Sequence, residues 1–306
     1  MPSFPVSSTL ALIGVPTDAG ASMRGACLGP GALRVAGLAE ALLRRGLAVI
    51  DRGDLAGPPY PGPASHHDGY RHLDEVTQWN TLVHRAVSDE LRAGHLPVLL
   101  GGDHSVAIGS ISAAAQHCRR TERELRVLWL DAHADFNTRE LTPSGNLHGM
   151  PVACLCGDGP PALVSLGGPA PALQAQQIRQ IGVRSVDDGE RSALYHAGIA
   201  VYDMRAIDEL GMRSIMANAL KGLTGNTHLH VSFDVDFHKQ AQTCFTDHSN
   251  GCRLGSGLPC SLIVKHFHFA QFGQRIEATS ELESTHALEV FTFDKDLRLH
   301  ALVQKT

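Results

Sequence analysis

Residues 125–135 read LRVLWLDAHAD and residues 229–236 read LHVSFDVD, so each stretch joins an apolar run to charged side chains. Such runs are typical of strands buried on both faces of a parallel sheet. Side chains alternate between the faces of a strand, so Asp131, His133 and Asp135 share a face if the chain stays extended. The carboxyl ends of strands in an open parallel sheet meet at one crevice. The two stretches therefore predict a parallel sheet with clustered carboxylates and an imidazole at that edge.

A third stretch, LPVLLGGDHS at residues 96–105, also joins a short apolar run to polar residues and adds His104 to the predicted cluster. Carboxylates this close repel one another unless a cation neutralises them. Carboxylates with two imidazoles and no thiolate suit a hard or borderline divalent ion, Mn²⁺ before Zn²⁺. Six ligands are too many for one catalytic ion with open positions, so we expect two ions. The expected ligands are His104, Asp131, His133, Asp135, Asp234 and Asp236.

The rest of the chain alternates predicted strands with predicted helices. Such alternation, with strands that read as buried, predicts a three-layer α/β/α fold around a parallel, doubly wound central sheet. The length, 306 residues, suits one large domain spanning residues 1–306. Strands are expected at residues 10–15, 47–50, 96–100, 125–130, 178–181, 199–202 and 229–233, and helices at 31–43, 72–94, 105–115 and 203–220.

Composition excludes several classes of protein. A hydrophobic fraction of 43% argues against disorder, and a net charge of −5 gives no basic surface for nucleic acid. No apolar stretch approaches the roughly 20 residues that span a bilayer, and residues 1–5 lack the pattern of a signal peptide. The seven cysteines lack CxxC spacing and are expected to be free thiols in a reducing compartment. We therefore expect a cytoplasmic protein whose partner is a small molecule rather than nucleic acid or a membrane.

Taken together, the motifs GGDHS, DAHAD and SFDVD, in this order and spacing, resemble those of the ureohydrolase superfamily of arginases, agmatinases and formimidoylglutamases. Two further segments are similar to arginases within that superfamily. SGNLHG at residues 144–149, preceded by Asn137, resembles the arginase substrate loop, and residues 13–26 are also arginase-like. The resemblance covers about residues 8–236 of a single ureohydrolase domain.

The resemblance implies hydrolysis of L-arginine to L-ornithine and urea by a metal-bridging hydroxide, in a homo-oligomer that is a trimer or hexamer. It implies two Mn²⁺ ions that share Asp131 and Asp234. His104 and Asp135 would complete the first site, and His133 and Asp236 the second. His148 matches the histidine that shuttles a proton to the leaving amine, and Asp135 is assigned to the catalytic residues as well. The residues that would recognise the α-carboxylate and α-amino groups are Asn137, Ser144, Asn146 and Asp187.

Two other features have a plainer structural interpretation. The glycine-rich loop at residues 20–26 follows a strand and so could cradle a dinucleotide phosphate, but it contains no GxGxxG. A structural turn or a loop at the substrate entrance is the preferred interpretation. His228, His230 and the pair at residues 66–67 fit no motif and are expected to be core or surface histidines.

The family pattern ends after Asp236. A Leu-Asp-Pro, a glycine-rich loop and a last strand ending in Glu-x-Asn-Pro are expected there and are absent. Composition changes at the same point: before Phe237 the chain has one Lys and 18 Arg, and from Phe237 on it has four Lys and three Arg. Seven of the ten Phe but only one of the 16 Pro lie in this last part. A frameshifted or recombined 3′ end and genuine divergence both account for the change, and composition favours the first.

Residues 237–306 bear on both fold and activity. In the family the last strand is interior, so its loss is expected to leave neighbouring strand edges unpaired. Glu289 is the nearest match for the family's glutamate near the guanidinium, but it lies too far along the chain and lacks Asn-Pro. We expect this part to pack less regularly and to supply no such contact. Two alternatives to arginase follow: agmatinase or another ureohydrolase, which SGNLHG disfavours, and a catalytically impaired metal-binding protein, which the altered tail favours.

Overall fold

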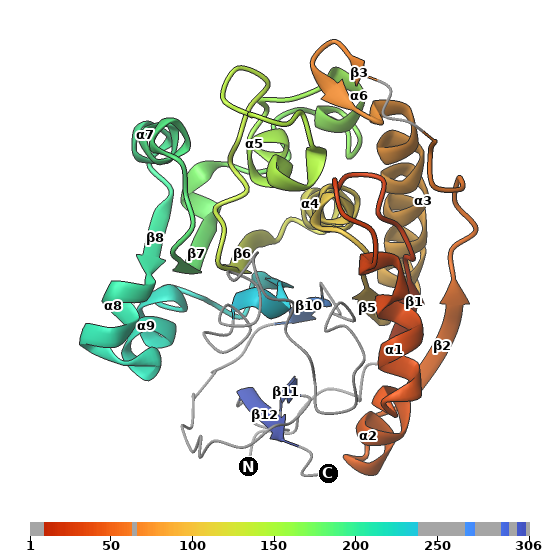
Figure 1. Cartoon of the computed structure of the whole chain (residues 1–306). Coiled ribbons are helices and arrows are strands. Elements are labelled where there is room, and N and C mark those ends of the chain that lie inside the picture. Colours follow the sequence, from red (N-terminus) through yellow and green to blue (C-terminus); the bar gives the residue numbers. More distant parts are fainter. Residues whose placement is uncertain (1–8, 63–65, 238–266, 273–288, 294–298, 304–306) are drawn as a thin grey trace, which may run out of the picture.

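The computed structural model describes residues 9–62, 66–237, 267–272, 289–293 and 299–303. Its centre is an eight-stranded sheet (Figure 1), in which seven strands run in the same direction and end at the same edge. The strands lie in the order β2 (Val49–Asp54), β1 (Leu10–Gly14), β5 (Leu96–Leu100), β10 (Phe267–Phe272), β9 (Thr227–Phe233), β6 (Glu124–Leu130), β7 (Ile178–Val183) and β8 (Ala200–Asp203).

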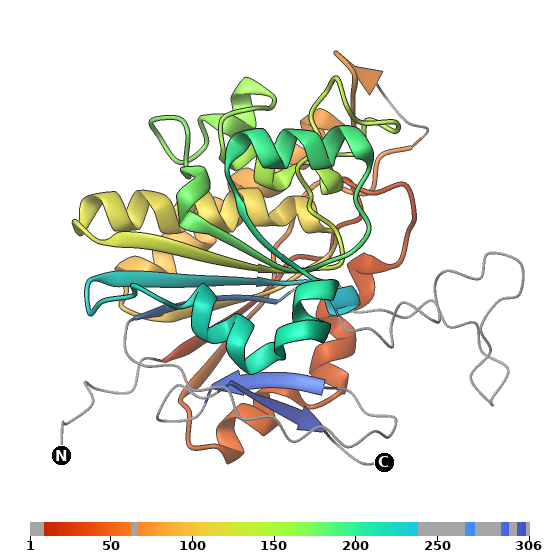
Figure 2. The same cartoon turned by 90° about the vertical axis from the view of Figure 1, so that its left-hand side faces the viewer.

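Helices cover both faces of this sheet, which gives three layers (Figure 2). One face packs on α1 (Gly29–Val35), α2 (Leu38–Arg44), α8 (Met204–Leu210) and α9 (Met212–Ala219). The other face packs on α3 (Leu73–Arg92), α4 (Ala107–Arg120), α5 (Pro151–Leu155), α6 (Pro161–Val164) and α7 (Asp188–Ala197). The predicted α/β/α architecture is confirmed.

Strands β1, β5 and β6 are largely apolar because both of their faces are buried. In β6, Val127 and Trp129 join the core beneath α4, while Leu128 and Leu130 join the core on the opposite side. Helix α3 shows the complementary pattern, since its buried apolar residues recur every three or four positions. Alternate residues of a strand therefore pack on opposite helical layers, and the buried residues of α3 form the one face that packs on the sheet.

Two predicted helices are each divided in the structure. The segment predicted at residues 31–43 is α1 and α2, separated at Gly37, whose φ is 80°. The segment predicted at residues 203–220 is α8 and α9, separated at Gly211, whose φ is 77°. A positive φ is tolerated by glycine and interrupts a right-handed helix, so each glycine ends one helix and allows the next to turn away.

One strand departs from the predicted parallel order. β10 runs antiparallel between β5 and β9 and pairs with both of them. The expectation of an entirely parallel sheet is therefore wrong at this strand, and so is the expectation that the missing family strand leaves these edges unpaired. A strand from the altered tail fills the interior position because its backbone N–H and C=O groups meet those of both neighbours.

Two small sheets lie apart from the main one. β11 (Glu289–Phe293) pairs with β12 (Leu299–Val303), so Glu289 is on a different sheet from the strands that end at the predicted metal cluster. β3 (His66–His67) pairs with β4 (Tyr70–Arg71) in a short hairpin. Most of residues 238–306, for which we expect less regular packing, lies outside the described residues.

Among the described helices, none alone has the length and apolar composition to cross a membrane, and one bent pair, Ala26–Val35 with Leu38–Arg44, meets the criterion jointly.

Candidate metal centre

Three of the strands deliver the predicted ligands at the same edge of the sheet. The polar motifs begin at or shortly after the ends of β5, β6 and β9. After β5, the Asp103 carboxylate accepts a hydrogen bond from the Ser105 N–H at 3.0 Å and caps a single 3₁₀ turn, His104–Val106. This cap fixes the turn that carries His104.

The other two motifs share one local conformation. Asp131 Oδ1 accepts the His133 N–H at 2.8 Å, and Asp234 Oδ1 accepts the Asp236 N–H at 3.1 Å. Each is a turn in which an aspartate side chain accepts from the backbone two residues on, so the chain leaves the strand at once. Asp135 adopts a φ of 49°, in the left-handed region. The extended conformation on which the shared face depended is therefore not adopted by residues 131–135, although their side chains still converge.

The two imidazoles lie against different oxygens of the Asp131 carboxylate. His104 Nδ1 lies 2.9 Å from Asp131 Oδ2, 2.9 Å from Asp135 Oδ2 and 3.7 Å from Asp234 Oδ2. His133 Nδ1 lies 3.4 Å from Asp131 Oδ1 and 3.2 Å from Asp236 Oδ2. Two ligand groups result, His104–Asp131–Asp135 and Asp131–His133–Asp236, each with its ligand atoms within 4.8 Å of one another. Asp131 belongs to both groups.

Burial makes the charge of this cluster costly. Asp131, Asp135 and Asp234 are 0%, 6% and 4% exposed. Burial and the charge of Asp131 raise the pKa of Asp135 to about 7. Burial alone would lower the pKa of each histidine, but hydrogen bonds to the aspartates raise it to about 10 for His104 and about 11 for His133. The cluster therefore retains protons near neutral pH, and divalent cations in their place would satisfy the same oxygen and nitrogen atoms.

Polar residues inside the neighbouring strands hold the ligands in place. The buried Gln180 side chain on β7 donates to the Ala134 carbonyl at 2.6 Å. His104 Nε2 lies 2.8 Å from Ser232 Oγ on β9, and its ring stacks on Trp129 at 4.2 Å between centroids. Sequence reasoning missed Gln180 and Ser232. The signal that could have found them is a polar side chain in an otherwise apolar strand, because such a group is buried only with a partner.

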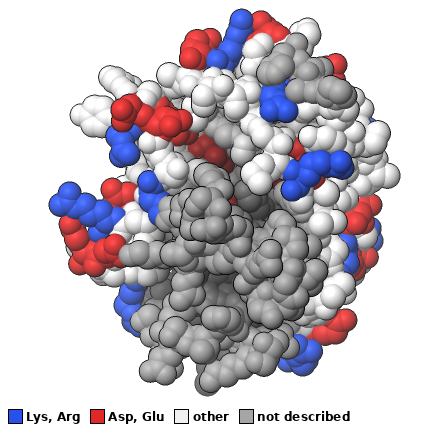
Figure 3. All heavy atoms as spheres, in the orientation of Figure 1, with Lys and Arg blue, Asp and Glu red and all other residues white. Residues whose placement is uncertain are grey.

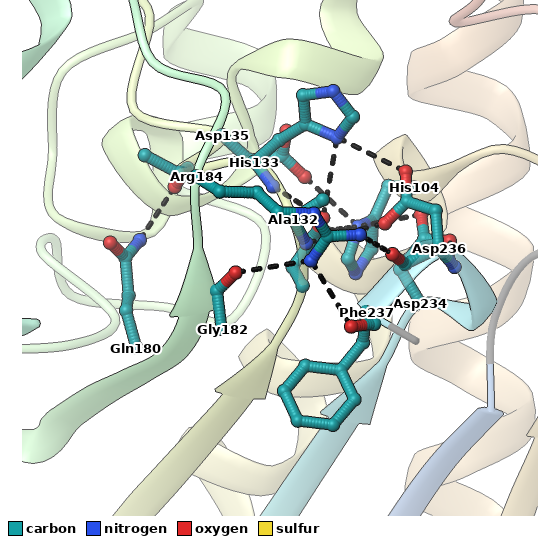
Figure 4. Close-up of polar contacts among 12 residues, drawn as sticks. His104, Ala132, His133, Asp135, Gln180, Gly182, Arg184, Asp234, Asp236 and Phe237 are labelled. Carbon is teal, nitrogen blue, oxygen red and sulfur yellow. Dashed lines mark hydrogen bonds and ion pairs between the residues drawn. The ribbon is translucent and has the colours of Figure 1, made fainter. Parts of the chain in front are cut away.

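The chain that follows the last ligand is also fixed. The Arg184 guanidinium donates to the carbonyls of Gly182, Asp236 and Phe237 (Figure 4). The Phe237 ring packs where Gly182 has no side chain, since a Cβ there would lie 2.4 Å from the ring. Asp234 and Asp236 are thus held by β9 on one side and by Arg184 on the other.

A cavity of about 200 Å³ lies over the cluster and collects the predicted substrate residues. Acidic side chains are visible in a recess on this face of the molecule (Figure 3). The structure brings the predicted residues together, with Asp131 buried behind the others. The cavity is lined by the cluster residues His104, His133, Asp135, Asp234 and Asp236 and by Asn137, Ser144, Asn146, His148 and Asp187.

Glu190 also lines the cavity and was missed by sequence reasoning. It lies in the first turn of α7 and accepts the Phe136 N–H at 2.8 Å, next to Asp135. Burial is the largest cause of a raised pKa at Glu190. The signal that could have found it is its place three residues after Asp187, since a carboxylate there both caps the helix and faces the same space.

The glycine-rich loop borders the predicted substrate loop. Asp18 accepts the N–H groups of Gly25 and Cys27, and Asp103 accepts that of Gly20. The Gly20 carbonyl in turn accepts the His148 N–H at 3.0 Å. Carboxylates already occupy N–H groups that a phosphate would need, so the loop is unsuited to a dinucleotide and supports the substrate loop instead.

The two unassigned histidines on β9 belong to the core. His228 and His230 are 0% and 2% exposed, and burial lowers the pKa of each to about 3. Both are therefore neutral, as expected for core histidines rather than ligands.

The fold and the cluster together define an α/β protein with a carboxylate–imidazole cluster, in which two groups of side chains could each hold a metal ion. The arginase family model matches residues 8–248, twelve positions beyond the end of the resemblance seen in the motifs, and the chain belongs to the arginase family.

Individual relatives agree with this assignment. The chain is 39% identical to an arginase of Brevibacillus brevis over 232 residues, which are 76% of each protein. The structure of the Bacillus caldovelox arginase superposes with a TM-score of 0.67 at 39% identity, covering 72% of this chain and 74% of the other. An Entamoeba histolytica arginase solved in complex with L-ornithine superposes with a TM-score of 0.66 at 28% identity, covering 75% and 76%.

Proposed function

We propose that this chain, as a single domain, hydrolyses L-arginine to L-ornithine and urea with two Mn²⁺ ions. The observation that carries the proposal is the place of Asp131 between two histidine-containing ligand groups at the base of a cavity lined by the predicted substrate loop. The curated relatives described above are arginases, and the Entamoeba arginase was solved with L-ornithine.

The donor set fits a pair of cations of this kind. His104 Nδ1 has carboxylate oxygens of both Asp131 and Asp135 at 2.9 Å, and one N–H cannot satisfy both. His104, Asp131, Asp135 and Asp234 would hold one ion, and Asp131, His133, Asp234 and Asp236 the other. Oxygen with imidazole ligands favours Mn²⁺ among common divalent ions. Bound ions of this class lower the pKa of water towards about 7 and so supply hydroxide near neutral pH.

The remaining residues bind and orient the substrate. The acidic lining, which includes Asp187 and Glu190, attracts the guanidinium and α-ammonium groups of arginine. Asn137 and Ser144 present polar groups to the α-carboxylate. His148 lines the same cavity and donates a proton to the departing amine, which cannot leave as an anion.

The test is urea release by the purified protein with added Mn²⁺, from L-arginine and from agmatine. We expect urea and ornithine in equal amounts from arginine, weak release from agmatine, and none from Asp131→Ala. Asp89→Ala is the matched control, because Asp89 is an exposed aspartate on α3 paired with Arg92. A preference for agmatine would assign the chain to another ureohydrolase activity, and Mn²⁺ binding without urea would make it an impaired relative.

We also propose a cytoplasmic homo-oligomer. The described cysteines, Cys27, Cys118, Cys154 and Cys156, are all free thiols, which suits a reducing compartment. Exposed apolar side chains at Val35 and Tyr195, 91% and 84% exposed, are available to contact another subunit. Light scattering on the purified protein tests this, with a trimer or hexamer expected and a monomer contradicting it.

A further inference from the structure

The cavity poses an electrostatic problem for an amino-acid substrate. Its described lining has five carboxylates, at Asp135, Asp187, Glu190, Asp234 and Asp236, and no Lys or Arg. Such a lining attracts a guanidinium and an ammonium but repels an α-carboxylate. Two metal ions offset this repulsion only at the base, whereas the α-carboxylate belongs to the other end of the substrate. A positive charge near the substrate loop would offset this repulsion and add to the polar groups of Asn137 and Ser144.

Arg71, on β4, lies directly behind that loop. Its backbone N–H donates to the Gly145 carbonyl at 2.9 Å, and residues on both sides of Gly145 line the cavity. A Cβ built on Gly145 would lie 3.6 Å from Arg71 Cγ. The Arg71 guanidinium donates to Ser22 Oγ at 3.2 Å, and the Asn146 amide donates to the same hydroxyl. Ser22 thus ties the guanidinium to the cavity wall.

Arg71 forms no ion pair among the described residues, and its Nε is buried without a hydrogen-bond partner. The neighbouring Arg139 differs, because it pairs with Asp68 at 2.7 Å. Arg24, on the glycine-rich loop, stacks its guanidinium over Tyr60. Of these three arginines, Arg71 alone bonds to the backbone of the substrate loop.

We propose that Arg71 supplies the positive potential that selects substrates carrying an α-carboxylate, and that Ser22 is a positioning residue for it. This inference rests on the proposed arginase function and names the residue that separates arginine from its decarboxylated analogue agmatine. Arg71 acts through the loop and the field it creates, so it is not a catalytic residue. Removing its charge weakens recognition of the carboxylate and leaves the chemistry at the guanidinium unchanged.

The first measurement is kcat/KM for arginine and for agmatine in Arg71→Met. We expect the arginine-to-agmatine ratio to fall roughly threefold to tenfold, as for the loss of one partly screened charge, mainly through a higher KM for arginine. Arg71→Lys keeps the charge and should retain most of the preference. Arg139→Met removes a paired charge from the same region and should leave the ratio unchanged. If Arg71 had only a general structural role, the substitution would lower kcat/KM for arginine and for agmatine by the same factor.

The second measurement does not depend on turnover. Calorimetry on the Mn²⁺-loaded protein compares L-ornithine with 1,4-diaminobutane, which lacks only the carboxylate. We expect Arg71→Met to weaken the binding of ornithine by a similar factor and to leave the binding of diaminobutane unchanged. In 0.5 M salt, the difference in ornithine affinity between wild type and variant should become smaller.

These measurements separate the two ideas. If wild type releases no urea but binds ornithine in an Arg71-dependent way, the proposed function fails and the inference stands. If the ratios in Arg71→Met match wild type, if Arg139→Met shifts them equally, or if wild type binds neither ligand, the inference is overturned. If Arg71→Met does not fold, Ser22→Ala replaces it and is expected to lower the arginine-to-agmatine ratio by a smaller factor. Ser22→Thr, which keeps the hydroxyl, should restore the ratio. An unchanged ratio in Ser22→Ala overturns the inference.

Discussion

Asp131 has the central position in the metal cluster because its two oxygens face different histidines. Asp131 belongs to both ligand groups, whereas each histidine belongs to only one of them. Asp131→Ala is therefore expected to abolish binding of both ions, as is Asp234→Ala if it too bridges. His104→Ala should weaken mainly one site. Metal analysis after dialysis checks this, and two tightly held Mn²⁺ ions in Asp131→Ala would contradict the bridging role.

His148 lies in the cavity but outside the two ligand groups. A proton donor of this kind can be removed without loss of metal. We expect His148→Ala to keep its Mn²⁺ while kcat falls by roughly 10²- to 10⁴-fold, as is typical of general acid–base groups. Steady-state kinetics with metal analysis on the same sample measures both. Unchanged kcat would return His148 to the role of an ordinary polar residue.

Metal binding should depend on pH through the same cluster. The pKa values of His104, His133 and Asp135 are raised to about 10, 11 and 7, so the metal-free protein holds protons that the ions must displace. We expect protons to be released on Mn²⁺ binding at neutral pH and the apparent affinity to rise with pH up to about 11. Calorimetry in buffers of different ionisation enthalpy counts these protons. Proton uptake, or affinity independent of pH, would be inconsistent with this protonation state.

Most residues of the site were predictable, and the exceptions share a cause. The ligands follow apolar strands, so their convergence follows from the rule that parallel strands open on one crevice. The conformation of residues 131–135 did not follow, because the aspartate turns override the strand pattern. Gln180, Ser232 and Glu190 act through backbone atoms or rings of residues far away in sequence, and those contacts exist only once the sheet has formed.

At the scale of elements, the approach of two loops over the sheet edge depends on Gly102. A Cβ on Gly102 would lie 2.0 Å from the Thr17 carbonyl oxygen, a backbone atom that cannot move aside easily. We expect Gly102→Ala to lower the free energy of unfolding by roughly 1–3 kcal/mol through overpacking and to weaken metal binding through His104. Denaturant unfolding measures the change.

Gly31→Ala is the control for this variant. Gly31 lies in α1, and a Cβ there meets nothing within 4 Å. Alanine favours helix, so this variant should be more stable by roughly 0.5–1 kcal/mol. A loss of stability at Gly31, or none at Gly102, would show that contact with Thr17 does not decide the effect.

The breaks at Gly37 and Gly211 illustrate what sequence spacing misses, because apolar periodicity continues across them while the backbone turns.

For the whole molecule, the altered tail contributes β10 to the middle of the sheet. An interior strand hydrogen-bonded on both sides exchanges its amides slowly. We therefore expect hydrogen exchange in Phe267–Phe272 to be about as slow as in Thr227–Phe233, with which it pairs. Exchange of Phe267–Phe272 within seconds, while Thr227–Phe233 stays protected, would contradict this arrangement. The sequence did not predict this strand, because residues 237–306 carry none of the motifs that mark the family's last strand.

The predicted ligands all precede residue 237, and Arg184 fixes the chain just beyond them. The candidate metal centre therefore lies within the family-like part of the chain. The most direct test of the two-ion account is a crystal structure of the Mn²⁺-loaded protein with anomalous data at the manganese edge. We predict two peaks per chain, about 3.5–4 Å apart as in other two-metal sites, one beside His104 and Asp135 and one beside His133 and Asp236. A single peak, or the absence of a peak beside Asp131, would contradict the two-ion account.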